Sequence, residues 1–182
     1  MRLAVFCGSR IGNDPRYGEL TARTARAIAA RGWEIVYGGG HVGLMGVLAD
    51  AGLQAGANVI GVIPQALAVA EVAHAGLTKL HVVESMHARK ALMERLSDAF
   101  LALPGGFGTM DEFCEILSWA QLRIHGKPLA LLNAFGYFDE LLGLFDRMVR
   151  EGFVTPENRA LVRCEQTIDA ALEMFSSRFA SS

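Results

Sequence analysis

The sequence contains little cysteine. Its three cysteines, Cys7, Cys114 and Cys164, lie far apart, are odd in number and form no CxxC pair. Zinc ligands come in closely spaced pairs, and disulfide frameworks come as an even set in a short secreted chain. The cysteine pattern therefore argues against both a disulfide-stabilised fold and a zinc site.

Long apolar runs and an excess of basic charge are also missing. The N-terminal segment MRLAVFCGSR has one arginine before a five-residue apolar run that ends at Gly8, which is too short for a signal peptide. No segment approaches the roughly 20 apolar residues of a membrane span. The net charge of -2 and pI near 6.2 predict no nucleic-acid or anionic-membrane partner. We therefore expect a cytoplasmic protein.

The length and composition are those of an ordinary globular protein. The chain has 182 residues, 52% hydrophobic and 20% charged. At this length folding buries roughly 70% of the unfolded surface, so the core needs no covalent support. The slight apolar excess over the globular average suggests a buried contact between subunits.

Short β-rich runs alternate with helical patterns along the whole chain. Strands are predicted at residues 3–7, 34–37, 59–63, 79–83, 100–103, 129–132 and 161–163. Helices are predicted at residues 15–30, 44–55, 86–97, 109–124, 138–150 and 168–175, with the terminal 175–182 frayed. This alternation predicts a single doubly wound α/β domain over residues 1–182, with a mostly parallel sheet and helices on both faces. Ligands of such domains bind beyond the carboxyl ends of the strands.

Two glycine-containing loops follow the first two predicted strands. Gly8 and Ser9 come directly after the first strand and offer bare backbone and a hydroxyl to an anion, or simply form a tight turn. The second loop, YGGGHVGLMG at 37–46, matches GxGxxG, but no acidic residue ends the next strand to bind a ribose, so a dinucleotide site is disfavoured. These glycines are needed either for approach to a ligand or for a sharp turn beneath a neighbouring loop.

A third glycine-rich loop, LPGGFGTMDE at 103–112, has two interpretations. Gly105, Gly106 and Gly108 leave main-chain amides unshielded before a predicted helix, an arrangement suited to a single phosphate. No GK[ST] follows, which argues against nucleoside triphosphate hydrolysis. Alternatively, Thr109 and Glu112 stand at the spacing of a capping box, and acidic residues stabilise the first turn of a helix. On spacing alone, the capping role of Glu112 is favoured.

The segment SMHARK at 85–90 begins another predicted helix at the same edge. Ser85 is suited to the N-cap position. Arg89 and Lys90 then fall early in the helix, where positive charge is unfavourable to the helix dipole. Such a cation pair indicates a compensating anion, either a phosphate or an acidic neighbour, unless the two residues simply form a solvated helix face.

Together, SMHARK and LPGGFGTMDE, with WAQL and GKP downstream and CGS and YGGGHVGLMG upstream, closely resemble the Lonely Guy family of cytokinin-activating phosphoribohydrolases. The resemblance spans nearly the whole chain. It implies a Rossmann-like fold, a homodimer with active sites near the interface, and hydrolysis of the N-glycosidic bond of adenosine 5′-monophosphate, often N6-prenylated. Members of the family are often labelled lysine decarboxylases.

The resemblance also assigns roles to individual residues. Arg89 and Glu112 would be the catalytic pair, and no metal or organic cofactor is required. The nucleotide site would be lined by Gly8, Ser9, Glu71, Lys90, Gly105, Gly106, Phe107, Gly108, Thr109 and Ser118. Arg89 would contact either the phosphate or the leaving base. Two alternatives remain open, a general AMP-salvage nucleosidase and a nucleotide-binding module without turnover.

Overall fold

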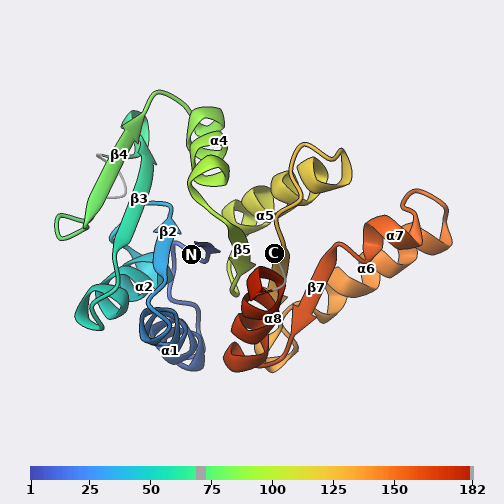
Figure 1. The fold of residues 1–182 in the computed structure, drawn as a ribbon, viewed down its shortest axis with the longest axis horizontal. Coiled ribbons are helices and arrows are strands. Elements are labelled where there is room, and N and C mark those ends of the chain that lie inside the picture. Colours follow the sequence, from blue (N-terminus) through green and yellow to red (C-terminus); the bar gives the residue numbers. More distant parts are fainter. Residues whose placement is uncertain (69–72, 181–182) are drawn as a thin grey trace.

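The computed structural model describes residues 1–68 and 73–180 and confirms the expected parallel α/β architecture. In this part of the chain seven strands form one sheet in the order β4-β3-β2-β1-β5-β6-β7, and every neighbouring pair is parallel. Figure 1 shows β4 and β3 toward one side of the molecule and β7 toward the other. The strands are β1 Arg2–Phe6, β2 Glu34–Tyr37, β3 Val59–Pro64, β4 Lys79–Val83, β5 Ala99–Ala102, β6 Leu129–Leu132 and β7 Val162–Glu165.

Helices cover both faces of this sheet. They are α1 Arg16–Ala30, α2 Gly43–Gln54, α3 Gln65–Ala68, α4 Met86–Leu96, α5 Phe107–Gln121, the 3-10 turn η1 Ala134–Gly136, α6 Asp139–Arg150, α7 Pro156–Arg159 and α8 Ile168–Ala180. Side chains alternate along each strand, so Leu3 and Val5 of β1 pack with α1, α2 and α8 on one face. Ala4 and Phe6 pack with α4, α5 and α6 on the other. Burial on both faces explains why β1 has no polar side.

The strand order reverses between β1 and β5. From β1 the chain winds through β2, β3 and β4 on one side, and from β5 it winds through β6 and β7 on the other. Phe6 and Ala102 pair near the carboxyl ends of β1 and β5, so the loops that leave these strands are adjacent. This is the switch point at which open α/β sheets bind ligands.

Several predicted boundaries are wrong. The helix predicted at 109–124 begins at Phe107 and ends at Gln121, and the short helix α3 occupies part of an expected loop. Residues 175–180 are helical, although they were expected to be frayed. Phe175 is completely buried and the Ser176 hydroxyl donates to the Leu172 carbonyl, so core packing continues the last helix beyond the apolar pattern.

Among the described helices, none is both long and apolar enough to cross a membrane.

Candidate active site

The glycine loop after β5 contains two kinds of glycine. A Cβ added at Gly105 would lie 2.1 Å from Thr109 Oγ1 and 2.9 Å from the Gly8 backbone nitrogen, so close packing requires a glycine there. In contrast, no atom of the described residues lies within 4 Å of a Cβ added at Gly106 or Gly108. Packing does not explain these two glycines, and an open backbone is what an approaching ligand needs.

The start of α5 lies in the same loop. Gly106 is the N-cap, in an extended conformation, and no side chain caps it. The first turn of a helix has backbone amides without intrahelical acceptors and the positive end of the dipole. Thr109 is only 3% exposed, and among the described residues its hydroxyl has no hydrogen-bond partner. Unpaired donors at a helix N-terminus are suited to binding an anion.

The loop after β1 completes this site. Gly8, Ser9, Gly105, Gly106 and Phe107 line one cavity of about 520 Å³. The structure thus brings together five of the predicted binding residues. We call this group, with Gly108 and Thr109, the phosphate cradle.

Tyr137 also lines this cavity, and sequence reasoning missed it. Its hydroxyl donates to the Gly105 carbonyl at 2.6 Å. Tyr137 follows β6 at the same sheet edge, but no local pattern distinguishes it from an ordinary loop tyrosine.

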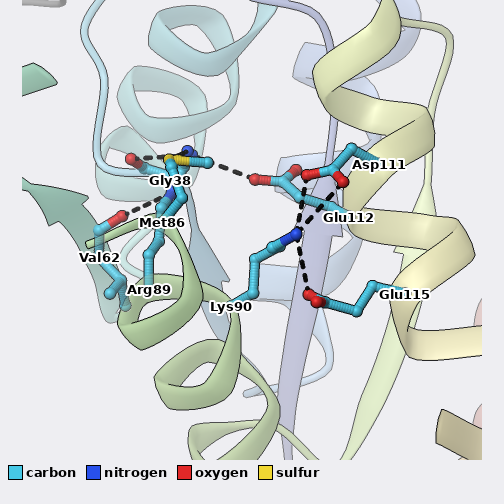
Figure 2. Close-up of polar contacts among 8 residues, drawn as sticks. All are labelled: Gly38, Val62, Met86, Arg89, Lys90, Asp111, Glu112 and Glu115. Atoms are coloured by element: carbon cyan, nitrogen blue, oxygen red, sulfur yellow. Dashed lines mark hydrogen bonds and ion pairs between the residues drawn. The ribbon is translucent and has the colours of Figure 1, made fainter.

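The capping interpretation of Glu112 is wrong. Because α5 begins at Phe107, Thr109 is its third residue and Glu112 its sixth, in the second turn. Glu112 is 8% exposed, and its Oε1 lies 3.2 Å from Nη2 of Arg89 on α4. Figure 2 shows the Glu112 carboxylate directed across to α4. Thr109 and Glu112 have the spacing of a capping box, but α5 begins two residues before Thr109, so Thr109 is not its N-cap.

Arg89 is held in place by two strands as well as by Glu112. Its Nε donates to the Val62 carbonyl at 3.1 Å and its Nη2 to the Gly38 carbonyl at 3.3 Å, near the carboxyl ends of β3 and β2 (Figure 2). Arg89 is 6% exposed. A buried guanidinium fixed by two carbonyls offers Glu112 a rigid charge partner.

The same contacts explain the glycines of the second loop. A Cβ at Gly38 would lie 2.0 Å from Arg89 Nη2. Gly43 has a φ of +61°, and a Cβ there would lie 2.3 Å from the Ser9 carbonyl carbon. Of the two explanations left open by the sequence, a turn packed beneath its neighbours accounts for both residues.

Lys90 contacts the other acidic residues of α5. Its Nζ lies 3.0 Å from Asp111 Oδ2 and 3.1 Å from Glu115 Oε2 (Figure 2). Burial alone would lower the pKa of Lys90, but the contacts with Asp111 and Glu115 raise it above its ordinary value. Arg89 and Lys90, the two cations in the first turns of α4, therefore have acidic partners on α5. The sequence had left open whether a phosphate or an acidic neighbour compensates them. Ser85 caps the helix as predicted, accepting from the Ala88 amide at 3.1 Å.

Three predicted binding residues are not placed in the phosphate cradle: Lys90, which contacts Asp111 and Glu115, Ser118 and Glu71. The Ser118 hydroxyl donates to the Cys114 carbonyl at 2.8 Å. Ser118 lines a separate cavity between α5 and α6, which includes Phe145 and Met148. Glu71 lies outside the described residues.

Cys7 and Glu112 are close enough to interact electrostatically. Burial strongly raises the pKa of the Cys7 thiol, and the nearby Glu112 carboxylate raises it further. Phe6, the last residue of β1, and Glu112 line the same small cavity, so Glu112 lies near the carboxyl end of β1. In the residues that the structure describes, no group of three histidine, cysteine or acidic side chains is arranged to hold a metal ion.

Comparisons with known proteins agree on one family. The family described as "Possible lysine decarboxylase" matches residues 45–175. A cytokinin riboside 5′-monophosphate phosphoribohydrolase of Rhodococcoides fascians is 48% identical over 96% of this chain and 89% of its own. An enzyme of the same name from Arabidopsis thaliana is 44% identical over 88% of this chain and 76% of its own. A probable one from Oryza sativa subsp. japonica is 48% identical over 88% and 72%.

Solved structures share the fold at much lower sequence identity. The Moco carrier protein of Chlamydomonas reinhardtii superimposes with a TM-score of 0.74 at 20% identity, over 100% of this chain and 98% of its own. DNA processing protein A of Helicobacter pylori has a TM-score of 0.61 at 19% identity, over 98% and 81%. At such identities the likeness concerns the fold alone.

Proposed function

The chain belongs to the family of the cytokinin riboside 5′-monophosphate phosphoribohydrolases, and on that premise we propose that it hydrolyses the N-glycosidic bond of AMP or of an N6-modified adenosine 5′-monophosphate. The products are the free base and ribose 5-phosphate. The observation that carries this proposal is the position of a buried carboxylate, Glu112, on the same helix whose N-terminus forms the phosphate cradle.

In this proposal the phosphate cradle binds the 5′-phosphate. The open backbone at Gly106 and Gly108 and the unpaired Thr109 hydroxyl supply donors. The cradle and Glu112 are separated by about one and a half helical turns, or roughly 8 Å along the axis. That separation is comparable to the length of a ribose 5-phosphate from its phosphate to its anomeric carbon, so a phosphate bound at the N-terminus leaves the anomeric carbon beside Glu112.

Glu112 is then the catalytic residue. When the bond between the anomeric carbon and the base nitrogen breaks, its electrons leave with the base and positive charge develops on the sugar. The carboxylate stabilises that charge and accepts a proton from the water whose oxygen bonds to the anomeric carbon. The base nitrogen takes up a proton from solvent as it leaves, and the proton accepted by Glu112 returns to solvent, so that the net reaction consumes one water molecule.

Arg89 acts as a positioning residue for this carboxylate. Its guanidinium is bonded to the Val62 and Gly38 carbonyls and lies against Glu112, so it holds the carboxylate in a fixed orientation. Anchoring at β2 and β3, away from the β1/β5 cradle, favours this role over a phosphate contact. Lys90 bridges α4 to α5 through Asp111 and Glu115 and supports the same geometry.

Lysine decarboxylation, suggested by the family description, is not supported by the lysines. That chemistry uses pyridoxal phosphate bound to a lysine amine as a Schiff base. Lys90 has acidic partners and a raised pKa, and Lys127 Nζ lies 2.6 Å from Glu94. Lys79 lies exposed on β4, the strand at the edge of the sheet. Two of the three amines therefore have acidic partners and the third lies on an exposed residue, whereas a Schiff-base lysine needs an enclosed amine without such partners.

The proposal is tested by incubating the protein with AMP and with N6-isopentenyl-AMP and following the free base by chromatography. Release of base from at least one nucleotide is expected. A preference for the N6-substituted nucleotide indicates cytokinin activation, and equal rates indicate a general nucleosidase. Nucleotide binding without release of base would show that the chain is a binding module and overturn the proposal.

Thr109→Val separates phosphate binding from stability. The substitution removes a buried hydroxyl that has no partner among the described residues, so it should raise the free energy of unfolding by about 1 kcal/mol. Loss of a hydrogen bond to the charged phosphate should raise KM by about 10- to 100-fold with kcat little changed. Steady-state kinetics and chemical denaturation measure the two effects. Thr109→Ser keeps the hydroxyl and is the control. An unchanged KM in Thr109→Val would contradict the cradle.

We further propose that the protein is a homodimer. Large apolar side chains lie exposed beside the site, including Phe107 at 97%, Met86 and Val82. Val82 is near the carboxyl end of β4, and Met86 and Phe107 begin the helices that follow β4 and β5, so all three lie toward the same edge of the sheet, and exposed apolar side chains there are suited to an interaction surface. Light scattering should give a mass twice the 19.6 kDa of one chain. A mass of one chain at micromolar concentrations would contradict the dimer.

A further inference from the structure

A second cavity lies at the opposite edge of the sheet from the phosphate cradle. It has a volume of about 670 Å³ and lies at the amino ends of β6 and β7, beside the ends of α5 and α8. Helix α5 has 15 residues, so its two ends are about 22 Å apart. The cradle is at one end and this cavity at the other.

Basic side chains from four segments of the chain line this cavity. Arg123 follows α5, Lys127 precedes β6, Arg163 belongs to β7 and Arg178 to α8. No acidic side chain is found among the described residues that line it. The whole chain has a net charge of -2, so this is a local concentration of positive charge on a slightly acidic protein.

Internal contacts compensate only part of this charge. Lys127 Nζ lies 2.6 Å from the Glu94 carboxylate, and Arg178 Nη2 donates to the Gly126 carbonyl at 3.2 Å. Within the described part of the chain, neither Arg123 nor Arg163 forms an ion pair or a side-chain hydrogen bond. Two guanidinium groups therefore face the cavity region with their donors available.

Arg123 also stands where glycine would be the usual residue. The Arg123 amide donates to the Ala120 carbonyl and the Ile124 amide to the Trp119 carbonyl, the pattern that ends a helix in a Schellman motif. Its φ is +59°, a conformation that strains residues with a Cβ. A cation near a helix C-terminus interacts favourably with the helix dipole, which explains a basic residue at position 123. It does not explain why three further basic side chains line the same cavity.

We propose that this cavity binds a compact oligophosphate, such as pyrophosphate or the phosphate chain of a nucleoside diphosphate, at a site separate from the active site. Guanidinium groups bind phosphate oxygens in bidentate pairs, and two linked phosphates would match Arg123 and Arg163, the two lining arginines for which the described residues provide no ion pair. The volume lies in the range of small-molecule sites. Leu129, Leu161 and Met174 add an apolar wall on which the rest of a nucleotide can pack.

The test is isothermal titration of the full chain with pyrophosphate and, separately, with ADP, at low ionic strength. Arg123→Gly/Arg163→Ala should bind each ligand at this site about 10- to 100-fold more weakly than the wild type, because charge-assisted hydrogen bonds are lost. The glycine relieves the positive φ of residue 123, so the variant should fold. The matched control is Arg23→Ala/Arg26→Ala, which removes two exposed arginines of α1 and should leave the affinity unchanged.

The outcomes distinguish the two anion sites. If the wild type binds ADP more tightly than pyrophosphate and Arg123→Gly/Arg163→Ala does not, the nucleoside of ADP packs on the apolar wall. If the wild type binds both ligands equally, the site recognises only the diphosphate. Isotherms that are the same for the wild type and Arg123→Gly/Arg163→Ala, but altered by Thr109→Val, would place all binding at the cradle and overturn the proposal. Absence of binding to the wild type would overturn it as well.

Discussion

Glu112→Gln should lower kcat for base release by about 10²- to 10⁴-fold, the contribution typical of a positioned acid–base group. Glutamine keeps the shape of the side chain and a possible hydrogen bond to Arg89 Nη2, which lies 3.2 Å from the carboxylate. It removes the negative charge that stabilises the developing oxocarbenium ion and accepts the proton of water. KM should change little, because the phosphate cradle is intact. Single-turnover and steady-state assays with the better of the two nucleotides measure this.

Asp111→Asn is the matched control for Glu112→Gln. Asp111 is the preceding residue of α5, and its carboxylate contacts Lys90 and is half exposed. Removing this charge should change kcat by less than about tenfold, because partly exposed ion pairs contribute about 1 kcal/mol or less. Equal losses in the two variants would indicate that Glu112 acts only through the structure of α5. Full activity of Glu112→Gln would refute its catalytic role.

Arg89→Ala should have the largest effect on stability of any change in the site. The guanidinium bonds to the Gly38 and Val62 carbonyls and lies against the buried Glu112 carboxylate. Removing one partner of a buried ion pair costs about 3–5 kcal/mol, because the remaining charge stays in a poorly solvated site. For a chain of this size the melting temperature should fall by on the order of 10 °C. Activity should fall by about 10²-fold or more, because the carboxylate is no longer held in position.

A double-mutant cycle attributes this cost to the charge pair. Adding Glu112→Gln to Arg89→Ala removes the buried charge that was left behind, so the double variant should be more stable than Arg89→Ala alone by about 1–3 kcal/mol. Arg95→Ala, at an exposed position of the same helix, is the control and should change stability by less than about 0.5 kcal/mol. Additive effects of the two substitutions would mean that Arg89 and Glu112 do not interact energetically.

Sequence patterns alone predicted the fold because they are repeated along the chain. Apolar runs such as residues 34–37 and 129–132 alternate with helical patterns, and each agrees with the same parallel α/β architecture. Ser85 was predicted as an N-cap from its position, and the structure confirms it. These predictions concern the hydrogen bonds and the burial pattern of a single helix or strand, which depend mainly on residues close together in the sequence.

The local sequence also identified the loop that we propose as the phosphate cradle, but its spacing favoured a capping role for Glu112 that the structure contradicts. The pattern LPGGFGTMDE is compatible with a helix that begins at Thr109 or at Phe107, and the difference of two residues moves Glu112 from a capping position to the second turn. The early start follows from the packing of Gly105 against Thr109 and the Gly8 amide. That packing involves a loop about 100 residues away, which local spacing does not report.

The amino-acid sequence was sufficient to predict the succession of strands and helices along the chain and the sheet edge at which the three glycine-containing loops meet. That the third of these loops binds an anion stays a prediction. Only the tertiary structure decided that Glu112 faces Arg89, that Gly38 makes room for that arginine, that Lys90 is compensated by Asp111 and Glu115, and that Ser118 lies elsewhere. The physical reason is that a buried charge requires a partner, and the packing of α4 beside α5 and the ends of β2 and β3 determines which side chain that partner is.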